Sequence, residues 1–124
     1  MSLICYFFDG CKYSFFQFGI CHVSAAIDQL ETMMQATVDR GTGTDAQIEG
    51  YRVVGKTGTA EIASDQGGYQ QGVYNISFVG YLPDSSTNLV CFVGAYDVPG
   101  ERQTVEAFHD IMTFAIDRYN ITQN

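Results

Sequence analysis

The sequence predicts an α+β fold in which helices flank an antiparallel sheet. Two apolar stripes with helical spacing, near residues 24–40 and 104–119, enclose three extended segments. Turn-forming sequences join these segments, which favours hairpins and antiparallel pairing over the long crossovers that parallel strands need. The predicted order is therefore helix, three strands, helix.

The size and charge of the chain limit what it can be. Its 124 residues suffice for one small domain, and 46% hydrophobic residues indicate a folded core. A net charge of -8 argues against nucleic acid or an anionic membrane as partner. No apolar run is long enough to span a bilayer, and Asp9, Gly10 and Lys12 make residues 1–20 a poor signal peptide or anchor. We expect any targeting segment of an extracytoplasmic protein to lie outside this chain.

Residues 1–22 differ in composition from the rest. They are rich in Phe, Tyr and Cys and show no clean period. We interpret them as an atypical segment that is vector-derived, out of frame or divergent, and we place the domain at residues 23–124. The four cysteines, Cys5, Cys11, Cys21 and Cys91, lack the short paired spacings of a zinc site, so no metal is expected. Cys91 lies in a strand-like run and is predicted to be a small core residue.

The first helix is predicted over residues 24–40. Ser24 is the candidate N-cap and Gly41 the C-terminal stop. An apolar stripe follows at helical spacing, with a methionine pair expected to fill the core: Ile27, Leu30, Met33, Met34 and Val38. The sequence therefore predicts a helix that is buried along this stripe.

Three strands and a second helix should follow. The first strand runs through Tyr51, Val53 and the Lys-Thr-Gly-Thr segment, and the second through residues 75–82 with alternate residues, from Ile76 to Leu82, on one face. The third, residues 89–96, is a nearly continuous apolar run and is interpreted as covered on both faces. The final helix begins near Thr104, its predicted cap, and carries an unbroken apolar stripe: Phe108, Ile111, Met112, Ala115, Ile116 and Tyr119.

The stretch from Gly50 to Ala60, GYRVVGKTGTA, contains two motifs. It matches the phosphate loop G-x-x-x-x-G-K-[ST], and it contains the K-T-G of penicillin-interacting serine enzymes. A phosphate loop needs a tight bend followed by a helix at Lys56 and Thr57. Here an aromatic and two β-branched residues favour a strand, and Gly58 would disfavour a helix start. The phosphate-loop interpretation is therefore set aside.

An edge strand with this sequence could form one wall of a binding cleft. Lys56 would supply an ammonium group, and the hydroxyls of Thr57 and Thr59 would bind a carboxylate of the substrate. Gly58 would let a ligand backbone approach and pair with the strand. The backbone N–H of Thr59 could join an oxyanion hole. We predict Lys56 as the catalytic-site residue and Thr57, Gly58 and Thr59 as substrate-binding residues.

The flanks of this strand resemble a known family. The segments MMQATVDRGTGTDAQIEGYRVVGKTGTAE and NISFVGYLPDSSTNLVCFVGAYD resemble the C-terminal part of the transpeptidase domain of high-molecular-weight, monofunctional (class B) penicillin-binding proteins. The resemblance covers residues 23–121. It implies a five-stranded antiparallel sheet with helices on both faces, of which the predicted strands are the last three. It further implies a membrane-anchored extracytoplasmic parent that cross-links peptidoglycan stem peptides in elongation or cell division, binds β-lactams, and uses a serine acyl-enzyme without a cofactor.

The resemblance also implies motifs that these 124 residues do not contain. The family's nucleophile lies in Ser-x-x-Lys, and no serine here has a lysine three positions later. Ser86-Thr87-Asn88 matches the family's Ser-x-Asn, but it lies downstream in a predicted turn. We therefore interpret the chain as an incomplete domain that is inactive by itself. The alternatives are a fragment of a serine β-lactamase or D,D-carboxypeptidase, and a non-catalytic binding module.

In the family, the strand formed here by residues 89–96 is paired on both sides. An open apolar edge invites pairing with another chain. We expect either a homo-oligomer through that edge, or residues 4–18 folding back as a replacement strand.

Overall fold

The computed structural model describes residues 2–8, 20–87, 89–100 and 103–124, with side chains from residue 25 onward. The expectations for Cys5, Cys11 and Cys21 lie outside the described side chains. The elements are β1 (Ser2–Phe8), α1 (Ile20–Arg40), the 3-10 turn η1 (Thr44–Ala46), β2 (Val54–Ala63), β3 (Tyr69–Tyr81), β4 (Val90–Val98) and α2 (Gln103–Tyr119).

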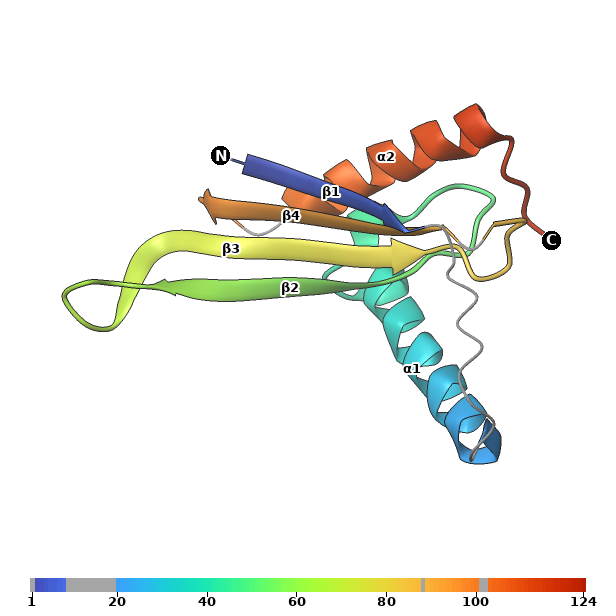
Figure 1. Cartoon of the computed structure of the whole chain (residues 1–124), viewed down its shortest axis with the longest axis horizontal. Coiled ribbons are helices and arrows are strands. Elements are labelled where there is room, and N and C mark those ends of the chain that lie inside the picture. The colour runs from blue at the N-terminus through green and yellow to red at the C-terminus, as the bar shows by residue number, and fades with distance from the viewer. Residues whose placement is uncertain (1, 9–19, 88, 101–102) are drawn as a thin grey trace.

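The strands form one antiparallel sheet in the order β1-β4-β3-β2 (Figure 1). The three predicted strands and their hairpin order are confirmed, but β2 begins at Val54, after Tyr51 and Val53, and β3 begins at Tyr69. In addition, β1 pairs with β4 from Ser2 opposite Tyr96 to Phe8 opposite Val90, which covers the edge that was expected to be open. The prediction of a replacement strand is thus confirmed for residues 4–8, the strand also includes residues 2 and 3, and residues 9–18 of the prediction lie outside the described part of the chain. The strand β2 forms the opposite edge of the sheet.

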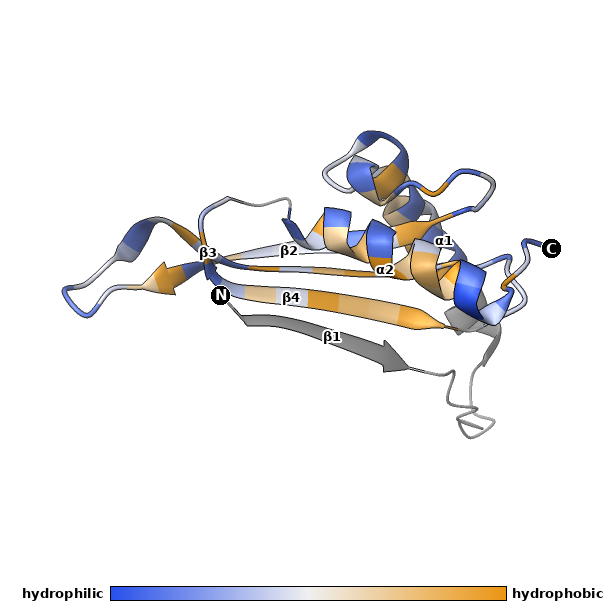
Figure 2. Cartoon of the chain, turned by 90° about the horizontal axis from the view of Figure 1, so that it is seen from above, coloured by the Kyte–Doolittle hydropathy of each residue, from blue (hydrophilic) through white to orange (hydrophobic). Residues whose placement is uncertain are grey.

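The core lies between α2 and one face of the sheet. Alternate residues of β3 point into it, and Phe78 meets Phe108 of α2 edge to face, with ring centroids 4.8 Å apart. Cys91 of β4 and Met112 of α2 are fully buried in the same cluster, as their patterns predicted. Figure 2 shows that β4 is largely hydrophobic, whereas the loop between β2 and β3 is hydrophilic.

The helix α1 differs from its prediction in two ways. It begins at Ile20, so Ser24 lies inside the helix and is not its N-cap. Its apolar stripe is exposed at Ile27 (51%), Leu30 (53%) and Met33 (62%), and only Val38 is buried. The physical reason is that α1 runs away from the sheet on the β2 side, so only its C-terminal turns reach the core (Figure 1). The predicted end is confirmed, because α1 stops at Arg40 and the Gly41 N–H donates to the Thr37 carbonyl at 3.1 Å.

Three further details of the prediction are corrected. Thr104 is the second residue of α2, and is buried within the first turn instead of capping it. Tyr119, at the end of the predicted stripe, is 68% exposed beside Arg118. Phe92 in β4 is only half-buried, so this strand is fully covered on one face and not on both.

Candidate functional site

The Lys-Thr-Gly-Thr segment lies in the middle of β2, in regular antiparallel pairing with β3. Thr57 is opposite Phe78, and Gly58 is opposite Ser77. No helix begins at Lys56 and Thr57, so the phosphate-loop geometry is absent from this described segment. Because β2 is the last strand of the sheet, its outer backbone edge can pair with an extended ligand.

The ammonium group of Lys56 lies against the next residue of its own strand. Its Nζ donates to the Thr57 carbonyl at 2.8 Å and to Thr57 Oγ1 at 3.3 Å. Successive residues of a strand point to opposite faces, so the long Lys56 side chain must curl back to reach Thr57. The structure thus brings together the predicted cation and the first predicted hydroxyl.

Gly58 and Thr59 complete the predicted set. Thr59 is exposed and stands two residues beyond Thr57, on the same face of the strand. A Cβ at Gly58 would lie 2.6 Å from Ser77 Oγ, so the glycine also leaves room for the neighbouring strand's hydroxyl. The site therefore has one exposed ammonium, two hydroxyls on one face, and a residue without a side chain between them.

The sequence interpretation missed Thr42, which lies in the turn after α1. Its Oγ1 is 2.8 Å from Thr57 Oγ1, although the two residues are 15 apart in the chain. The backbone on both sides of Thr42 is held, because the N–H groups of Gly41 and Gly43 both donate to the Thr37 carbonyl. The only signal in the sequence was its place within Gly-Thr-Gly, a part of the segment that carries the family resemblance.

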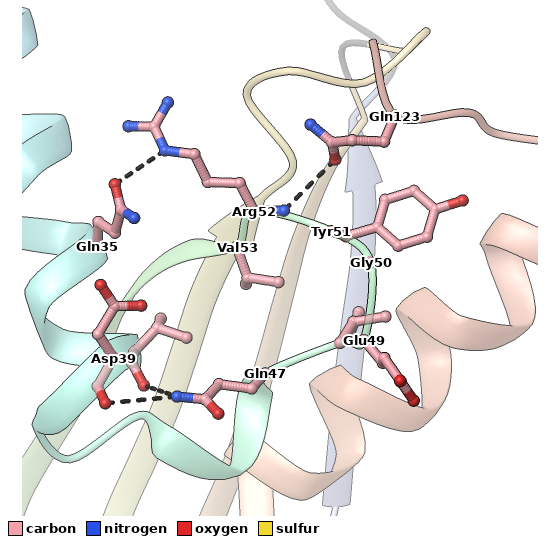
Figure 3. A pocket seen from close by; sticks show the side chains of 11 residues that line it. Gln35, Asp39, Gln47, Glu49, Gly50, Tyr51, Arg52, Val53 and Gln123 are labelled. Atoms are coloured by element: carbon pink, nitrogen blue, oxygen red, sulfur yellow. Dashed lines mark hydrogen bonds between the residues drawn. The ribbon is translucent and has the colours of Figure 1, made fainter.

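A cavity of about 910 Å³ lies beside the segment that leads into β2. Figure 3 shows its lining, which combines the C-terminal half of α1, the segment before β2 and the chain's last residues. Gln47 borders it and donates from Nε2 to the carbonyls of Val38 and Asp39. None of the four predicted site residues lines this cavity, so it is separate from the Lys56 site.

Arg52 joins the elements around this cavity. Its guanidinium contacts Glu31 at 2.9 Å and Gln35 at 2.8 Å on α1, and Asp84 at 3.1 Å in the β3–β4 connection. Burial alone would lower the pKa of Arg52, but the hydrogen bond to Asp84 and the charges of Glu31 and Asp84 outweigh it and raise the pKa. Arg52 therefore remains charged and ties α1 to the beginning of β2.

Ser86 and Thr87 lie in the connection between β3 and β4, as predicted, and Asn88 lies outside the described residues. Ser86 donates its N–H to the Thr122 carbonyl at 2.8 Å, and its Oγ accepts from the Thr122 N–H at 3.0 Å. These bonds hold the C-terminal tail, so Ser86 does not contribute to the Lys56 site.

Two kinds of feature are absent from the part of the chain that the structure describes. No group of three or more His, Cys, Asp or Glu side chains is arranged to hold a metal ion. Among the same residues, no helix has the length and apolar character needed to cross a membrane.

Comparison with known proteins gives a consistent result. The model of the penicillin binding protein transpeptidase domain matches residues 23–113. The chain is 39% identical over 75 residues to stage V sporulation protein D of Bacillus subtilis, covering 60% of this chain and 12% of that protein. It is 35% identical over 92 residues to penicillin-binding protein PbpB of Mycolicibacterium smegmatis, covering 68% of this chain and 14% of that protein.

Solved structures show the same similarity. Penicillin-binding protein 3 of Mycobacterium tuberculosis in complex with ampicillin aligns with a TM-score of 0.67 at 28% identity, covering 78% of this chain and 25% of that one. The transpeptidase domain of penicillin-binding protein 3 from Burkholderia pseudomallei aligns with a TM-score of 0.65 at 32% identity, covering 76% of this chain and 30% of that one. The chain thus spans 12% and 14% of the lengths of the two curated relatives.

Proposed function

This chain belongs to the penicillin-binding protein transpeptidase family, and from that premise we propose that it is part of a peptidoglycan D,D-transpeptidase and forms one wall of its catalytic cleft. The observation that carries the proposal is the position of Lys-Thr-Gly-Thr on the open edge strand β2, with Lys56 bonded to Thr57. An edge strand offers backbone groups to an extended peptide, and the side chains beside it offer charge and hydroxyls.

Each site residue has a proposed role. Lys56 stabilises negative charge in the cleft, while Thr57 and Thr59 donate hydrogen bonds to the carboxylate of a stem peptide or a β-lactam. Gly58 keeps the strand accessible to the ligand backbone. The relative from Mycobacterium tuberculosis is solved with ampicillin and with aztreonam, which supports β-lactams as ligands of the complete protein. Serine acyl transfer needs no cofactor, and none is proposed.

We propose that this chain alone does not acylate. The serine nucleophile and its base lysine act as a unit, and no Ser-x-x-Lys occurs within these 124 residues. A fluorescent penicillin should leave the chain unlabelled on a denaturing gel, whereas a longer protein containing the motif should be labelled. Stable labelling of the chain itself would contradict this part of the proposal.

Binding without chemistry is the direct test of the cleft wall. In an NMR titration, a peptidoglycan stem peptide should shift the amide signals of residues 56–59, and its C-terminal amide derivative should bind more weakly. Lys56→Ala and Thr57→Val should each weaken binding by about tenfold, the size of one charge-assisted hydrogen bond. Arg118→Ala on α2 is the matched control for loss of an exposed cation. Absence of shifts at millimolar peptide, or equal effects of all three variants, would contradict the assignment.

A second candidate is a non-catalytic module that binds the same peptide. For such a module, binding of the peptide without penicillin labelling would be the full activity. Translating the DNA upstream of the Val23 codon distinguishes the transpeptidase from the non-catalytic module. An upstream Ser-x-x-Lys followed by Ser-x-Asn supports the transpeptidase, and absence of both supports the module.

Three wider assignments complete the proposal. The parent protein is extracytoplasmic and membrane-anchored. Residues 1–22 are an atypical N-terminal segment that precedes the transpeptidase-domain part at 23–124, and their strand β1 pairs with its sheet. The chain self-associates through an exposed strand edge. Because β1 covers β4, that edge is the outer side of β1, and Ser2–Phe8 contains no charge, proline or glycine to oppose pairing.

A further inference from the structure

We propose that Thr42 is a positioning residue of the carboxylate site, which orients the hydroxyl group of Thr57 toward the ligand. This inference rests on the proposed function, because it specifies how the same site recognises a carboxylate. Thr42 lies outside the Lys-Thr-Gly-Thr strand and reaches Thr57 from the turn after α1, with 2.8 Å between the two Oγ1 atoms.

A threonine hydroxyl has one hydrogen-bond donor and two acceptor positions. Lys56 Nζ donates to Thr57 Oγ1 at 3.3 Å and so takes one acceptor position. If Thr42 donates to Thr57 Oγ1, the second acceptor position is filled and the single Thr57 proton is free. A carboxylate can only accept, so only this arrangement lets Thr57 bind one.

The opposite direction of the Thr42–Thr57 bond would make Thr57 a poor carboxylate ligand. Thr57 would then donate its only hydroxyl hydrogen to Thr42 and present only oxygen lone pairs to a negative charge. Binding of a carboxylate therefore requires Thr42 to be the donor. In contrast, a neutral amide can bind either way, because it offers both a carbonyl acceptor and N–H donors.

The backbone around Thr42 is suited to this role. The N–H groups of Gly41 and Gly43 donate to the same Thr37 carbonyl, at 3.1 and 3.0 Å. A Cβ at Gly41 would lie 2.9 Å from Thr37 backbone atoms, and one at Gly43 would lie 3.1 Å from the Phe78 ring. Both glycines thus allow the turn to pack tightly against α1 and β3. The Thr42 hydroxyl is presented from a fixed backbone, so little entropy is lost when it orients Thr57.

The test compares Thr42→Val with Thr42→Ser in the whole chain. Valine keeps the shape of the side chain without its hydroxyl, and serine keeps the hydroxyl. Thr32→Val on α1 is the matched control, since it removes another exposed threonine hydroxyl, the one that donates to the Asp28 carbonyl at 2.8 Å. Thermal unfolding followed by circular dichroism confirms that each variant is folded. The probes are a stem peptide with a free C-terminal carboxylate and the same peptide as its amide, each titrated by NMR.

We expect Thr42→Val to bind the carboxylate peptide about tenfold more weakly, the effect of one net hydrogen bond. The affinity of Thr42→Val for the amide peptide should change less, so its preference for the carboxylate peptide over the amide peptide should decrease. Thr42→Ser and Thr32→Val should behave as the unmodified chain. If Thr42 had a purely structural role, Thr42→Val would weaken the binding of both peptides equally.

Each other result has a distinct meaning. Unchanged binding by Thr42→Val, or equal loss for both peptides, overturns the positioning role and leaves the proposed function in place. Loss in Thr42→Ser equal to that in Thr42→Val shows that the hydroxyl is not responsible, and also overturns it. If the unmodified chain binds neither peptide, or binds both equally, the carboxylate site itself is wrong, and both proposals fail together.

Discussion

At the scale of single residues, the structure explains the two glycines of β2, Gly55 and Gly58, in different ways. A Cβ at Gly55 would lie 2.3 Å from the Phe78 ring and 3.0 Å from the Val79 carbonyl oxygen. Phe78 is fully buried and the carbonyl belongs to the paired strand, so neither can move aside easily. At Gly58 the close atom is only the hydroxyl of Ser77, which can rotate. Gly55 is therefore required by packing, whereas Gly58 is tolerant as far as the fold is concerned.

Gly55→Ala should accordingly destabilise the chain by about 1–3 kcal/mol, the cost of overpacking a core. Gly58→Ala should change the free energy of unfolding by no more than about 0.5 kcal/mol, since its clash is relieved by one side-chain rotation. Urea unfolding of both variants measures this difference. Equal losses for the two variants would show that the packing around Phe78 is looser than the structure indicates.

Tyr81 provides a prediction about pH. Burial raises its pKa above the ordinary value of 10.0, and the charge of Glu31 raises it further, while Arg52 lowers it. The folded state therefore holds the phenol proton more tightly than the unfolded state. Its contribution to stability is complete below pH 10.0 and is lost as the pH rises through the raised pKa.

The comparison of the unmodified chain with Tyr81→Phe isolates this contribution, because the other tyrosines are common to both. The stability of the unmodified chain relative to Tyr81→Phe should fall as the pH is raised above 10.0. Urea unfolding at neutral pH and above 10.0 is the measurement. A difference that stays constant with pH would contradict the raised pKa.

At the scale of elements, α1 divides into two parts. Its C-terminal part enters the core through Val38, and Arg52 holds it through Glu31 and Gln35. Before Val38 in the chain, the apolar side chains of Ile27, Leu30 and Met33 are exposed, and we call them the α1 ridge. A helix receives most of its stability from a packed face, so the α1 ridge should contribute little to folding of this chain.

Leu30→Gln should therefore leave the free energy of unfolding within about 0.5 kcal/mol of the unmodified chain, because the two residues have similar helix propensity. Val38→Ala on the same helix should cost about 2 kcal/mol, because it removes two buried methyl groups. Thermal or urea unfolding of Leu30→Gln and Val38→Ala measures the two changes in the free energy of unfolding. A large loss in Leu30→Gln would mean that the α1 ridge is covered in solution, for example in an oligomer.

At the scale of the whole molecule, the two edges of the sheet differ. The edge strand β2 carries the charged residues Lys56 and Glu61, and its pairing with β3 is irregular after Glu61. Both features oppose edge-to-edge association. The other edge, β1, has the uncharged sequence SLICYFF. Association of two copies through β1 would continue the sheet across both molecules.

Light scattering over a range of concentrations should show that the unmodified chain self-associates. Tyr6→Lys should shift it toward the monomer, because a charged residue on an edge strand opposes pairing. Gln66→Lys, in the exposed β2–β3 loop, adds the same charge away from that edge and should have no effect. An unmodified chain that remains monomeric at every concentration would disprove the homo-oligomer.

Local patterns determined a large part of this protein. The alternation along β3 placed Phe78 in the core, and the spacing of Phe108 and Met112 predicted a buried face of α2. The β-branched residues before Lys56 were enough to distinguish a strand from a phosphate loop. These features depend on near neighbours in the chain, so the sequence contains them directly.

The tertiary structure alone decided which distant residues meet. It brought Thr42 to Thr57, joined Arg52 to Glu31 and Asp84, and placed β1 on the open edge of β4. It also left the α1 ridge exposed, although that stripe has the same helical spacing as the buried one on α2. Periodicity shows which face of an element is apolar, but what covers that face depends on how the elements are arranged in space. For this reason the strand of the candidate site was predictable, while the hydroxyl that completes it from another element was not.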